Sequence, residues 1–445
     1  MSDSKTETAL PVIVPRAEHD ISRAQIAKTA LKVLYRLRAA DYEAYLVGGG
    51  VRDLLLGLAP KDFDVATDAA PEQVRSVFGN CRLIGRRFRL AHVYFGREIV
   101  EVATFRAGPS ADEDEADHLQ ADGLLLRDNV YGTLEDDAFR RDFTVNALYY
   151  NIRDFGIYDY VGGLDDLHAG LLRMIGEPAV RYREDPVRML RAARFAAKLD
   201  FSIEPATAAP IATLGHLLHD VPPARLFDES LKLFLGGHAA ASYRVLRQYD
   251  LFGRLFPAAA AQVEAEGEAG VSHRLLHQAL ENTDARLALD RPVTPTFLFA
   301  ALAYPALRAE LDGCPLEAAT PEQVLQAGDR ALDALVERVA LPRRYRAPLQ
   351  EIWQLQPRFG QRNGKRALRL LAQPRFRAAY DFLLLRAGAG EADPALADWW
   401  TEIQQADAER QQGMLAAATG EGGNRNGRRR RRRRRSSRAA GGESA

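Results

Sequence analysis

The stretch LVGGGVRDLLLGLAPKDFDVAT, residues 46–67, constrains the fold of this chain more than any other. The apolar run at 45–47 predicts a short buried strand, and the glycines at 48–50 allow the backbone to approach a bulky group. Residues 51–56 predict a short helix that Gly57 ends, with its free N–H groups facing the glycines. The pattern therefore predicts a strand, a glycine turn and a helix in direct succession.

A phosphate group fits this arrangement, because free backbone N–H groups at a helix start attract anions. The candidate nucleotide-binding residues of the stretch are Gly49, Gly50 and Arg52. No Gly-Lys-Ser/Thr sequence follows the glycines, which argues against a P-loop NTPase. If the glycines are considered alone, the alternative is a structural hairpin that binds no phosphate.

Two acidic residues follow in the next extended segment. The side-chain period of two places Asp62 and Asp64 on one face of a predicted strand, with Phe63 on the other. Two carboxylates at such a short distance repel each other unless a cation lies between them, and their oxygen atoms are suitable ligands for Mg²⁺ or Mn²⁺. A solvated turn would explain the acids alone, but together with the glycines they indicate nucleotide chemistry.

Glu101 is a candidate third metal ligand. Its neighbours in the predicted strand are Ile99, Val100, Val102 and Ala103. A lone carboxylate among apolar side chains needs a partner, and a cation held by the two aspartates would supply one. The alternatives are an exposed edge-strand residue, or a salt bridge to Arg87 or Arg106.

Arg140, Arg141 and Asp142 precede an apolar run that predicts a helix from about Thr144. At the entrance of that helix, Arg141 and Asp142 could reach a ribose or a triphosphate. The alternative is a helix-capping aspartate beside solvated arginines, which is locally as good an interpretation.

The segment RYREDPVRMLRAARFAAKL, residues 181–199, predicts a helix with Asp185 as its N-cap and Pro186 at its first position. A basic stripe on one face of this helix consists of Arg188, Arg191, Arg194 and Lys198. Such a stripe is usually a solvated face. Here it directly follows a candidate nucleotide site, which makes contact with a triphosphate, a base or RNA an open second interpretation.

The basic residues are concentrated at the C-terminus, although the chain has a net charge of zero. Residues 1–424 carry 50 basic and 59 acidic side chains, whereas ten basic residues lie between Arg425 and Arg438. Like charges at this density cannot form a core, so the sequence predicts a disordered tail that binds polyanions, RNA above all. The candidate RNA-binding residues are Arg428, Arg429, Arg430, Arg431, Arg432, Arg433, Arg434 and Arg435.

Cysteine content and hydropathy exclude several classes of protein. Cys81 and Cys314 are too few for a disulfide framework, and we expect both to be reduced. No uncharged apolar run has the length of a membrane span, and MSDSKTETALPVIVP lacks the pattern of a signal peptide. A cytoplasmic enzyme is the expectation.

Several motifs together resemble one family, the class II tRNA nucleotidyltransferases and poly(A) polymerases. The motifs are LVGGGVRDLLLG with PKDFDVAT, then IVEVATFR, RRDFTVNAL and YREDPVRMLRAARFAAKL, over roughly residues 40–235. The stretches LIGRRFRLAHVYF and PPARLFDESLKLF are similar to the polymerases of the family rather than to its CCA-adding members.

The resemblance implies an α+β fold. An N-terminal nucleotidyltransferase head, a mixed β-sheet with helices, is followed by an all-α neck, body and leg and by a disordered basic C-terminal tail. The expected parts are a disordered N-terminus (1–20), the head (21–163), the neck (164–235), the body and leg (236–412) and the tail (413–445).

The resemblance also implies residue roles. The expected catalytic residues are Asp62, Asp64, Glu101 and Asp142, of which the first three bind metal. Arg141 lies near the ribose, and Glu184, Asp185 and Arg188 correspond to a motif that reads the incoming base. A base-reading Asp185 conflicts with its assignment as a helix cap. Arg191 is a further candidate nucleotide-binding residue.

The implied reaction is the addition of AMP from ATP to RNA 3′ ends, with Mg²⁺ or Mn²⁺ as cofactor and pyrophosphate released. The alternatives are a CCA-adding tRNA nucleotidyltransferase and an RNA-binding protein with an inactive head. RNA-decay proteins are further candidate partners.

Overall fold

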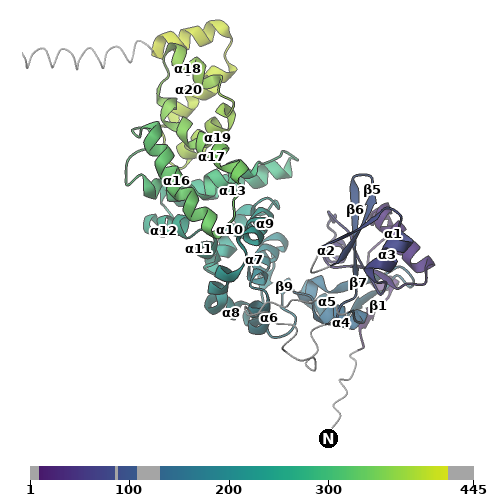
Figure 1. Ribbon diagram of the computed structural model, residues 1–445. Helices are drawn as coiled ribbons and strands as arrows, with labels where there is room; N and C mark the ends of the chain where they lie inside the picture. The colour runs from purple at the N-terminus through teal and green to yellow at the C-terminus, as the bar shows by residue number, and fades with distance from the viewer. Residues whose placement is uncertain (1–9, 86–88, 108–130, 419–445) are drawn as a thin grey trace, which may run out of the picture. The chain divides into compact units, whose positions relative to one another are not determined.

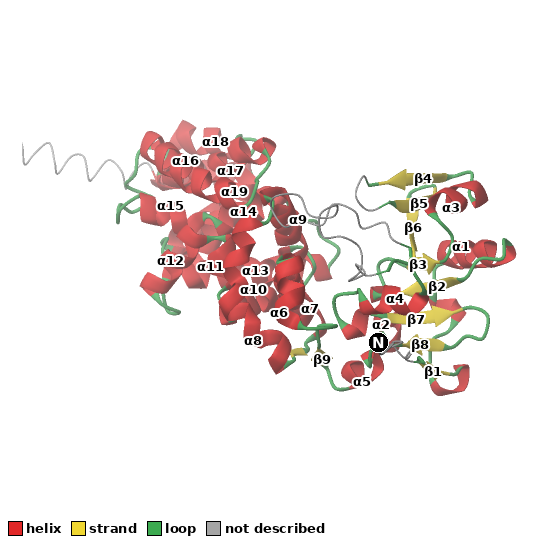
Figure 2. Cartoon of the chain, turned by 60° about the horizontal axis from the view of Figure 1, so that its bottom comes forward, coloured by secondary structure: helices red, strands yellow, loops and turns green. Residues whose placement is uncertain are grey.

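An eight-stranded mixed sheet forms the N-terminal part of the structure, a computed structural model that describes residues 10–85, 89–107 and 131–418 (Figures 1 and 2). The strands are β1 (Val12–Val14), β2 (Ala44–Val47), β3 (Asp64–Thr67), β4 (Cys81–Ile84), β5 (Leu90–Phe95), β6 (Glu98–Thr104), β7 (Leu148–Asn151) and β8 (Ile157–Asp159). Their order in the sheet is β1-β8-β7-β2-β3-β6-β5-β4. The mixed-sheet head expected from the sequence is confirmed.

The centre of the sheet is buried on both sides. Strand β3 pairs antiparallel with β2 and parallel with β6, so that Val65 lies opposite Leu46 on one neighbour and Val102 on the other. These three side chains on one face are almost fully buried, and so are Tyr45 and Ala66 on the other face. Parallel pairing requires a crossover connection, which here contains the next helix and the strands β4 and β5.

Helices cover the two faces of the sheet. The N-terminal helices of the head are α1 (Lys28–Ala39), α2 (Gly49–Leu55), α3 (Pro71–Val77), α4 (Leu134–Phe139) and α5 (Gly163–His168). Figure 2 shows α1 and α3 on one side of the sheet and α2 and α4 on the other. Helix α1 buries Val33, Leu34 and Leu37 at the spacing of one helix face. The sequence predicts short helices at 71–78, with a proline in the first turn, and at 134–139, and both predictions are confirmed.

Three local expectations for the head were wrong. Residues 12–14 were expected to be disordered but form β1, because this Val-Ile-Val run adds an edge strand to β8. The sequence predicts a helix up to about Ala40 that Asp20 or Ser22 caps, but Ser22 caps only a short 3-10 helix, Arg23–Gln25, and α1 begins at Lys28. The helix expected from Thr144 is a single 3-10 turn, η3 (Thr144–Asn146), followed by the buried strand β7.

The chain divides into two compact units, residues 1–217 and 218–445. The first unit contains, besides the head, the helices α6 (Pro178–Glu184), α7 (Val187–Leu199) and α8 (Pro205–Leu214) and a two-stranded parallel sheet of β9 (Leu171–Leu172) and β10 (Ser202–Ile203). The neck expected at 164–235 spans the boundary between the units. Its definition as a separate domain stays a prediction.

The described part of the second unit is helical, as expected. Its helices are α9 (Pro223–Phe234), α10 (Ala239–Gln248), α11 (Leu251–Leu255), α12 (Pro257–Glu266), α13 (Val271–Ala288), α14 (Pro295–Leu302), α15 (Tyr304–Glu310), α16 (Pro321–Arg338), α17 (Arg343–Leu355), α18 (Gly364–Leu371), α19 (Phe376–Gly388) and α20 (Pro394–Gln405). The fully buried indoles of Trp353 and Trp400 donate to backbone carbonyls, so the polar atom of each large side chain is satisfied.

Two boundaries in this unit differ from expectation. The sequence between the amphipathic helices of this unit predicts a loop near 258–270, yet α12 occupies most of that range, because an alanine run after Pro257 favours a helix. Residues 408–418 are helical, so that 413–418 do not belong to a disordered tail. The rest of that expected tail lies outside the described residues.

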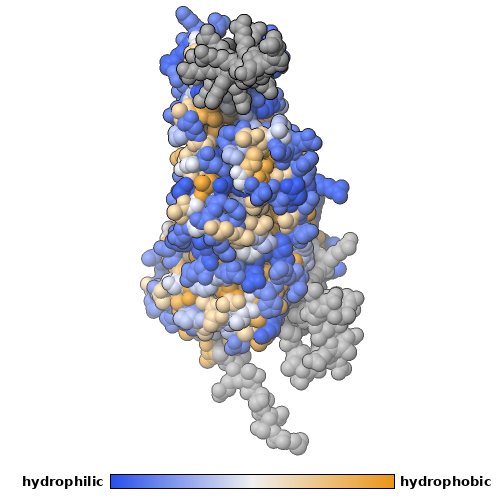
Figure 3. Space-filling view, turned by 90° about the vertical axis from the view of Figure 1, so that its left-hand side faces the viewer, coloured by the Kyte–Doolittle hydropathy of each residue, from blue (hydrophilic) through white to orange (hydrophobic). Residues whose placement is uncertain are grey.

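The surface offers no sign of a membrane span within the described chain. No helix there is both long and apolar enough to cross a bilayer. The face seen in Figure 3 is mainly hydrophilic, with apolar side chains in small groups. Cys81 and Cys314 are both free and half-buried.

Candidate nucleotide and metal site

The glycine turn after β2 forms as the sequence predicts, although α2 begins at Gly49 rather than Val51. Gly48 has a φ of +73°, in the left-handed region that favours glycine. A Cβ on Gly50 would lie 3.3 Å from the carbonyl oxygen of Asp62, so the small residue lets α2 approach the segment that carries the acids. The glycines thus place the start of α2 beside Asp62.

Asp64 and Glu101 project from the same face of the sheet. Asp64 immediately precedes Val65 in β3, and Glu101 immediately precedes Val102 in β6. Because the two valines are paired across the parallel strands, the two carboxylates are neighbours as well. The core side of both strands is taken by these valines, which leaves the carboxylates on the opposite side. Asp62 is exposed and precedes β3 rather than lying within it.

The carboxylates act on one another electrostatically. The side chain of Asp64 reaches solvent, but the surrounding protein desolvates it in part. This desolvation and the negative charges of Glu101 and Asp62 raise the pKa of Asp64 to about 6, although the positive charge of Arg141 acts to lower it. In the described parts of the chain, no three His, Cys, Asp or Glu side chains already converge as a metal site. The donor set still suits a divalent cation, because a positive charge there would relieve the repulsion.

Glu101 is not buried as the sequence analysis expected. Its side chain is 50% exposed, and its Oε1 lies 3.5 Å from Nε2 of His92 on the neighbouring strand β5. The strand alternation sends Val100 and Val102 to the core and Glu101 to the open side. Burial therefore gives no argument for a metal at Glu101; its position beside Asp64 does.

Arg141 lies at the edge of the glycine turn. Its Nε donates to Tyr149 Oη (2.9 Å) and to Asp137 Oδ2 (3.1 Å), and its Nη1 would lie 3.4 Å from a Cβ on Gly48. Burial alone would lower its pKa, but Tyr149 and Asp137 raise it above the ordinary value. Arg141 is thus a fixed positive charge next to Gly48 and within electrostatic range of Asp64.

Asp142 is held from several sides. Its Oδ2 accepts from Arg191 Nε (2.7 Å) and Nη2 (2.5 Å), and its Oδ1 accepts from Asn146 Nδ2 (3.2 Å) and from the backbone N–H of Phe143 (2.9 Å). Burial would raise the pKa of Asp142, but the charge and hydrogen bonds of Arg191 and the other two donors hold it below its usual range. In this structure its carboxylate positions Arg191.

Arg52 is interior rather than open to a ligand. It is 1% exposed; its Nε lies 2.9 Å and its Nη2 2.5 Å from Asp53 Oδ1, and its Nη1 donates to Asn146 Oδ1 (2.5 Å). Lys198 of α7 donates to the other oxygen of Asp53 (2.9 Å). The sequence predicts Arg52 as a nucleotide-binding residue, whereas its contacts are internal and link α2 to η3.

The Glu184-Asp185-x-x-Arg188 motif lies at the turn between α6 and α7. Arg188 Nη1 pairs with Glu184 Oε2 (2.8 Å) and donates to the carbonyl of Arg181 (2.7 Å). Asp185 Oδ1 accepts from the N–H of Val187 (3.2 Å), but α7 begins at Val187 with Pro186 as its N-cap, so Asp185 lies one residue before the cap position and ends α6 instead. A role in reading the base stays a prediction.

Two of the four residues of the basic stripe pair with acids of the head, Arg191 with Asp142 and Lys198 with Asp53. The guanidinium carbon of Arg194 lies 4.4 Å from the ring centre of Phe195. The stripe is therefore largely internal to the first unit, and the alternative of a simply solvated helix face is not supported. The predicted RNA-binding arginines at 428–435 lie outside the described residues.

Sequence reasoning missed the residues that hold the others in place, namely Asp137, Asn146 and Tyr149. Asn146, only 6% exposed, bonds to both Arg52 and Asp142. The position of Asn146 between Val145 and Ala147 was the available signal, because a buried amide must find partners. Of its two partners, Arg52 lies 94 residues away in the sequence, and Asp142 lies four residues before it in the same motif.

Three family models match the chain. They are described as "Poly A polymerase head domain" over residues 44–173, "Probable RNA and SrmB- binding site of polymerase A" over 200–263, and "Polymerase A arginine-rich C-terminus" over 317–437. Together they cover strands β2 to β8 of the sheet, some of the helices of both units and the arginine-rich segment.

Full-length relatives carry the same description. The chain is 51% identical over 422 residues to poly(A) polymerase I of Salmonella typhi. The aligned region covers 93% of this chain and 90% of that protein. Poly(A) polymerase I of Haemophilus influenzae is 48% identical over 408 residues, 91% of this chain and 90% of its own. A CC-adding tRNA nucleotidyltransferase of Halalkalibacterium halodurans is 35% identical over only 51% of this chain and 54% of its own.

Solved structures share the fold at lower identity. A structure described as a tRNA-processing enzyme has a TM-score of 0.57 at 20% identity and covers 87% of this chain and 99% of its own. A tRNA nucleotidyltransferase with a primer tRNA and an incoming ATP analog has a TM-score of 0.56 at 21% identity, over 84% of this chain and 98% of its own. At these identities the likeness concerns the fold alone.

Proposed function

The chain belongs to the poly(A) polymerase family, and from this membership we propose that it adds AMP from ATP to RNA 3′ ends and releases pyrophosphate. The observation that carries the proposal is identity of about half to poly(A) polymerase I over 93% of the chain. Relatives named for CC or CCA addition match only about half of it. The polymerase reaction is therefore favoured over CCA addition.

The family implies a nucleotide substrate and a divalent metal ion, and for this chain we propose ATP and Mg²⁺, with Mn²⁺ as the alternative. Asp62, Asp64 and Glu101 would hold the metal, which the mutual repulsion of their charges and the shared face of Asp64 and Glu101 support. A bound divalent cation would supply a lower pKa for the attacking 3′-hydroxyl and positive charge next to the phosphates.

The remaining residues of the site would orient the nucleotide. Arg141, fixed by Asp137 and Tyr149, would place a positive charge beside the glycine turn, where Gly49 and Gly50 admit the triphosphate. Asp142 would act by holding Arg191 toward the same region. Arg188, together with Asp185, is our proposal for contact with the adenine base.

RNA would bind through the segment 200–263 and through the arginines at 428–435. The family description of the first segment and the charge density of the second support this assignment. We further propose that the protein acts in the cytoplasm of a bacterial cell and that RNA-decay proteins are among its partners.

One assay of the purified protein tests the proposed reaction. Each single NTP is supplied in turn with a generic single-stranded RNA and with a tRNA that lacks its 3′ end. A homopolymeric A tail on the generic RNA is the expected product. A short C-C-A addition confined to the tRNA would refute polymerase activity, and an Asp64→Ala variant controls for contaminating enzymes.

A further inference from the structure

Helix α7 is joined to α2 and to η3 by a closed network of polar side-chain contacts. The network leaves α7 at Lys198, passes through α2 and η3, and returns to α7 at Arg191. Each link is a hydrogen bond or an ion pair of 2.5 to 3.2 Å. The members of this α7 network, in order, are Lys198, Asp53, Arg52, Asn146, Asp142 and Arg191.

The middle of the α7 network is interior. Arg52 is 1% exposed, and Asp53 and Asn146 are each 6% exposed. A buried charged or amide group that loses a partner raises the free energy of the folded state, because water does not replace the contact. Helix α7 therefore cannot shift against α2 without breaking a link of the network.

Two anchors hold α7 to the head. Arg191 and Lys198 are seven residues apart, which is two turns and about 10 Å along the helix axis. Between them, Phe195 is buried, with its ring centre 5.9 Å from that of Phe143 and 5.2 Å from the guanidinium carbon of Arg52. Two anchors and one packed side chain determine the height, the tilt and the rotation of α7, whereas a single anchor would leave the tilt free.

The other end of α7 carries the proposed base contact. Arg188 lies in the first turn, ten residues before Lys198, so the two residues are about 15 Å apart along one helix axis. Asp53 lies one turn after Gly49, the residue at which the glycine turn continues into α2. The Lys198–Asp53 pair therefore connects the helix that begins at the glycine turn with the helix that carries Arg188.

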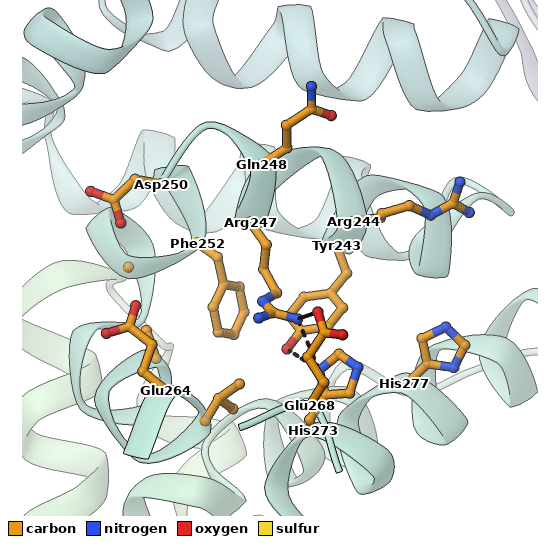
Figure 4. A pocket seen from close by; sticks show the side chains of 13 residues that line it. Tyr243, Arg244, Arg247, Gln248, Asp250, Phe252, Glu264, Glu268, His273 and His277 are labelled. Carbon is orange, nitrogen blue, oxygen red and sulfur yellow. Dashed lines mark hydrogen bonds and ion pairs between the residues drawn. The ribbon is translucent and has the colours of Figure 1, made fainter. Parts of the chain in front are cut away.

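A polar cluster of the second unit makes no such connection (Figure 4). Arg247 Nη1 of α10 lies 3.1 Å from His273 Nδ1 of α13 and 3.5 Å from Glu268, beside a cavity of about 460 Å³. The residues that line this cavity fall between 243 and 277, so none of them belongs to the candidate nucleotide site. The α7 network, in contrast, contains Asp142 and leads into the helix of the glycine turn.

We propose that Asp53 and Lys198 are positioning residues for base selection. By holding α7 against α2, their pair sets where Arg188 lies relative to a nucleotide whose phosphates occupy the glycine turn. A misplacement of about 1 Å can cost about a hundredfold in rate, and a stiff helix transmits a tilt at Lys198 to Arg188. The inference rests on the proposed polymerase function, and it adds two residues that act on the nucleotide without touching it.

Lys198→Met tests the proposal, because methionine keeps an apolar stem and removes the charge. The side chain of Lys198 is 34% exposed, so water can replace its ammonium group and the variant should fold. Arg191 still anchors the helix, so the ratio of kcat/KM for ATP to kcat/KM for CTP should fall by about five- to tenfold in single-nucleotide addition. Lys198→Arg, which keeps a charged donor for Asp53, should stay within about twofold of wild type.

A double-mutant cycle separates positioning from direct contact. Asp53→Asn should lower the same ratio, and the double variant should lower it no further than Lys198→Met alone, because the two side chains act as a unit. If Lys198 instead contacted the phosphates, its loss would raise the KM for ATP and the KM for CTP equally and leave the ratio unchanged. That outcome would overturn the proposal, and so would effects of the two substitutions that multiply.

Arg173→Met is the matched control. Arg173 pairs with Asp166 and Glu204 in the first unit but lies outside the α7 network. Its loss should lower the stability of that unit and leave the ratio within about twofold of wild type. An equal change of the ratio in Arg173→Met and Lys198→Met would assign the effect to reduced stability and overturn the positioning role.

The wild-type protein separates this failure from failure of the proposed function. An enzyme without polymerase activity would add no AMP to the RNA at all. An active enzyme whose ratio is the same with and without Lys198 would refute only the positioning role of the Lys198–Asp53 pair.

Discussion

Replacing Arg191 by alanine should destabilise the first unit by about 2 kcal/mol at pH 7. The substitution removes two hydrogen bonds to Asp142 and leaves that carboxylate, 11% exposed, with the amide of Asn146 and one backbone N–H. Breaking a fully buried pair costs about 3 to 5 kcal/mol and an exposed pair at most about 1. Arg191 is 33% exposed, so water can enter the vacated place and the expected cost lies between these limits.

The effect should depend on pH, with a defined sign. In the wild type the pKa of Asp142 is held below its ordinary value, so the pair contributes stability above that value and loses it as the pH falls through the lower one. Without Arg191, burial raises the pKa of Asp142, and the folded variant takes up a proton sooner. The difference between the free energies of unfolding of the two proteins should therefore shrink as the pH falls from 7 to 4.

The measurement must report on the correct unit. All three tryptophans, Trp353, Trp399 and Trp400, lie in the second unit, so fluorescence in urea should be unchanged by the substitution. Hydrogen exchange of peptides from residues 187–199, in increasing urea, reports on the first unit.

Arg183→Ala is the matched control for this experiment. Arg183 is exposed on α6 and donates only to the carbonyl of Ala179 among the contacts described, so its loss should cost at most about 0.5 kcal/mol. An equal loss of protection in both variants, or an Arg191→Ala effect that is the same at pH 7 and pH 4, would refute the reasoning.

Three further predictions concern activity. Asp62→Ala and Asp64→Ala should each reduce AMP addition by at least about a hundredfold without altering the unfolding transition, as measured by single-turnover extension, and Glu101→Gln should follow in the same direction. Arg188→Ala should lower the ratio of kcat/KM for ATP to kcat/KM for CTP by about five- to tenfold, since a good base contact is worth about 1 to 3 kcal/mol. If the ratio is unchanged and the stability is reduced, Arg188 has only a structural role, as the partner of Glu184. Deleting residues 416–445 should raise the RNA KM and flatten its dependence on salt while the KM for ATP stays constant, which steady-state kinetics at two salt concentrations would check.

Local sequence patterns predicted the elements that depend on local physics. The strand at 45–47 and the glycine turn after it follow from apolar periodicity and from residues with special backbone freedom. The same reasoning failed for Glu101, because neighbouring letters do not reveal which face of a strand meets the core. The register with β3 settles this, and register is a property of two strands.

The candidate site was predicted less completely than the fold, for a related reason. Arg52 was recognised as part of the glycine motif, but its partner Asn146 lies 94 residues away, and the lysine that completes Asp53 lies 145 residues from it. Only the folded chain brings these charges together. A basic stripe in a sequence specifies a helix face and leaves open whether solvent, a ligand or another part of the protein will neutralise it.

The pairing of α7 with the head has a consequence for protein engineering and for inheritance. Asp142 pairs with Arg191, 49 residues later in the sequence, and Asp53 pairs with Lys198, 145 residues later. A crossover between two homologues at the end of the sheet would therefore combine acids from one parent with bases from the other. Exchanges near residue 217 would keep each set from a single parent. Chimeras joined there should fold, and natural recombinants in this family should show their breakpoints outside the interval from Asp53 to Lys198.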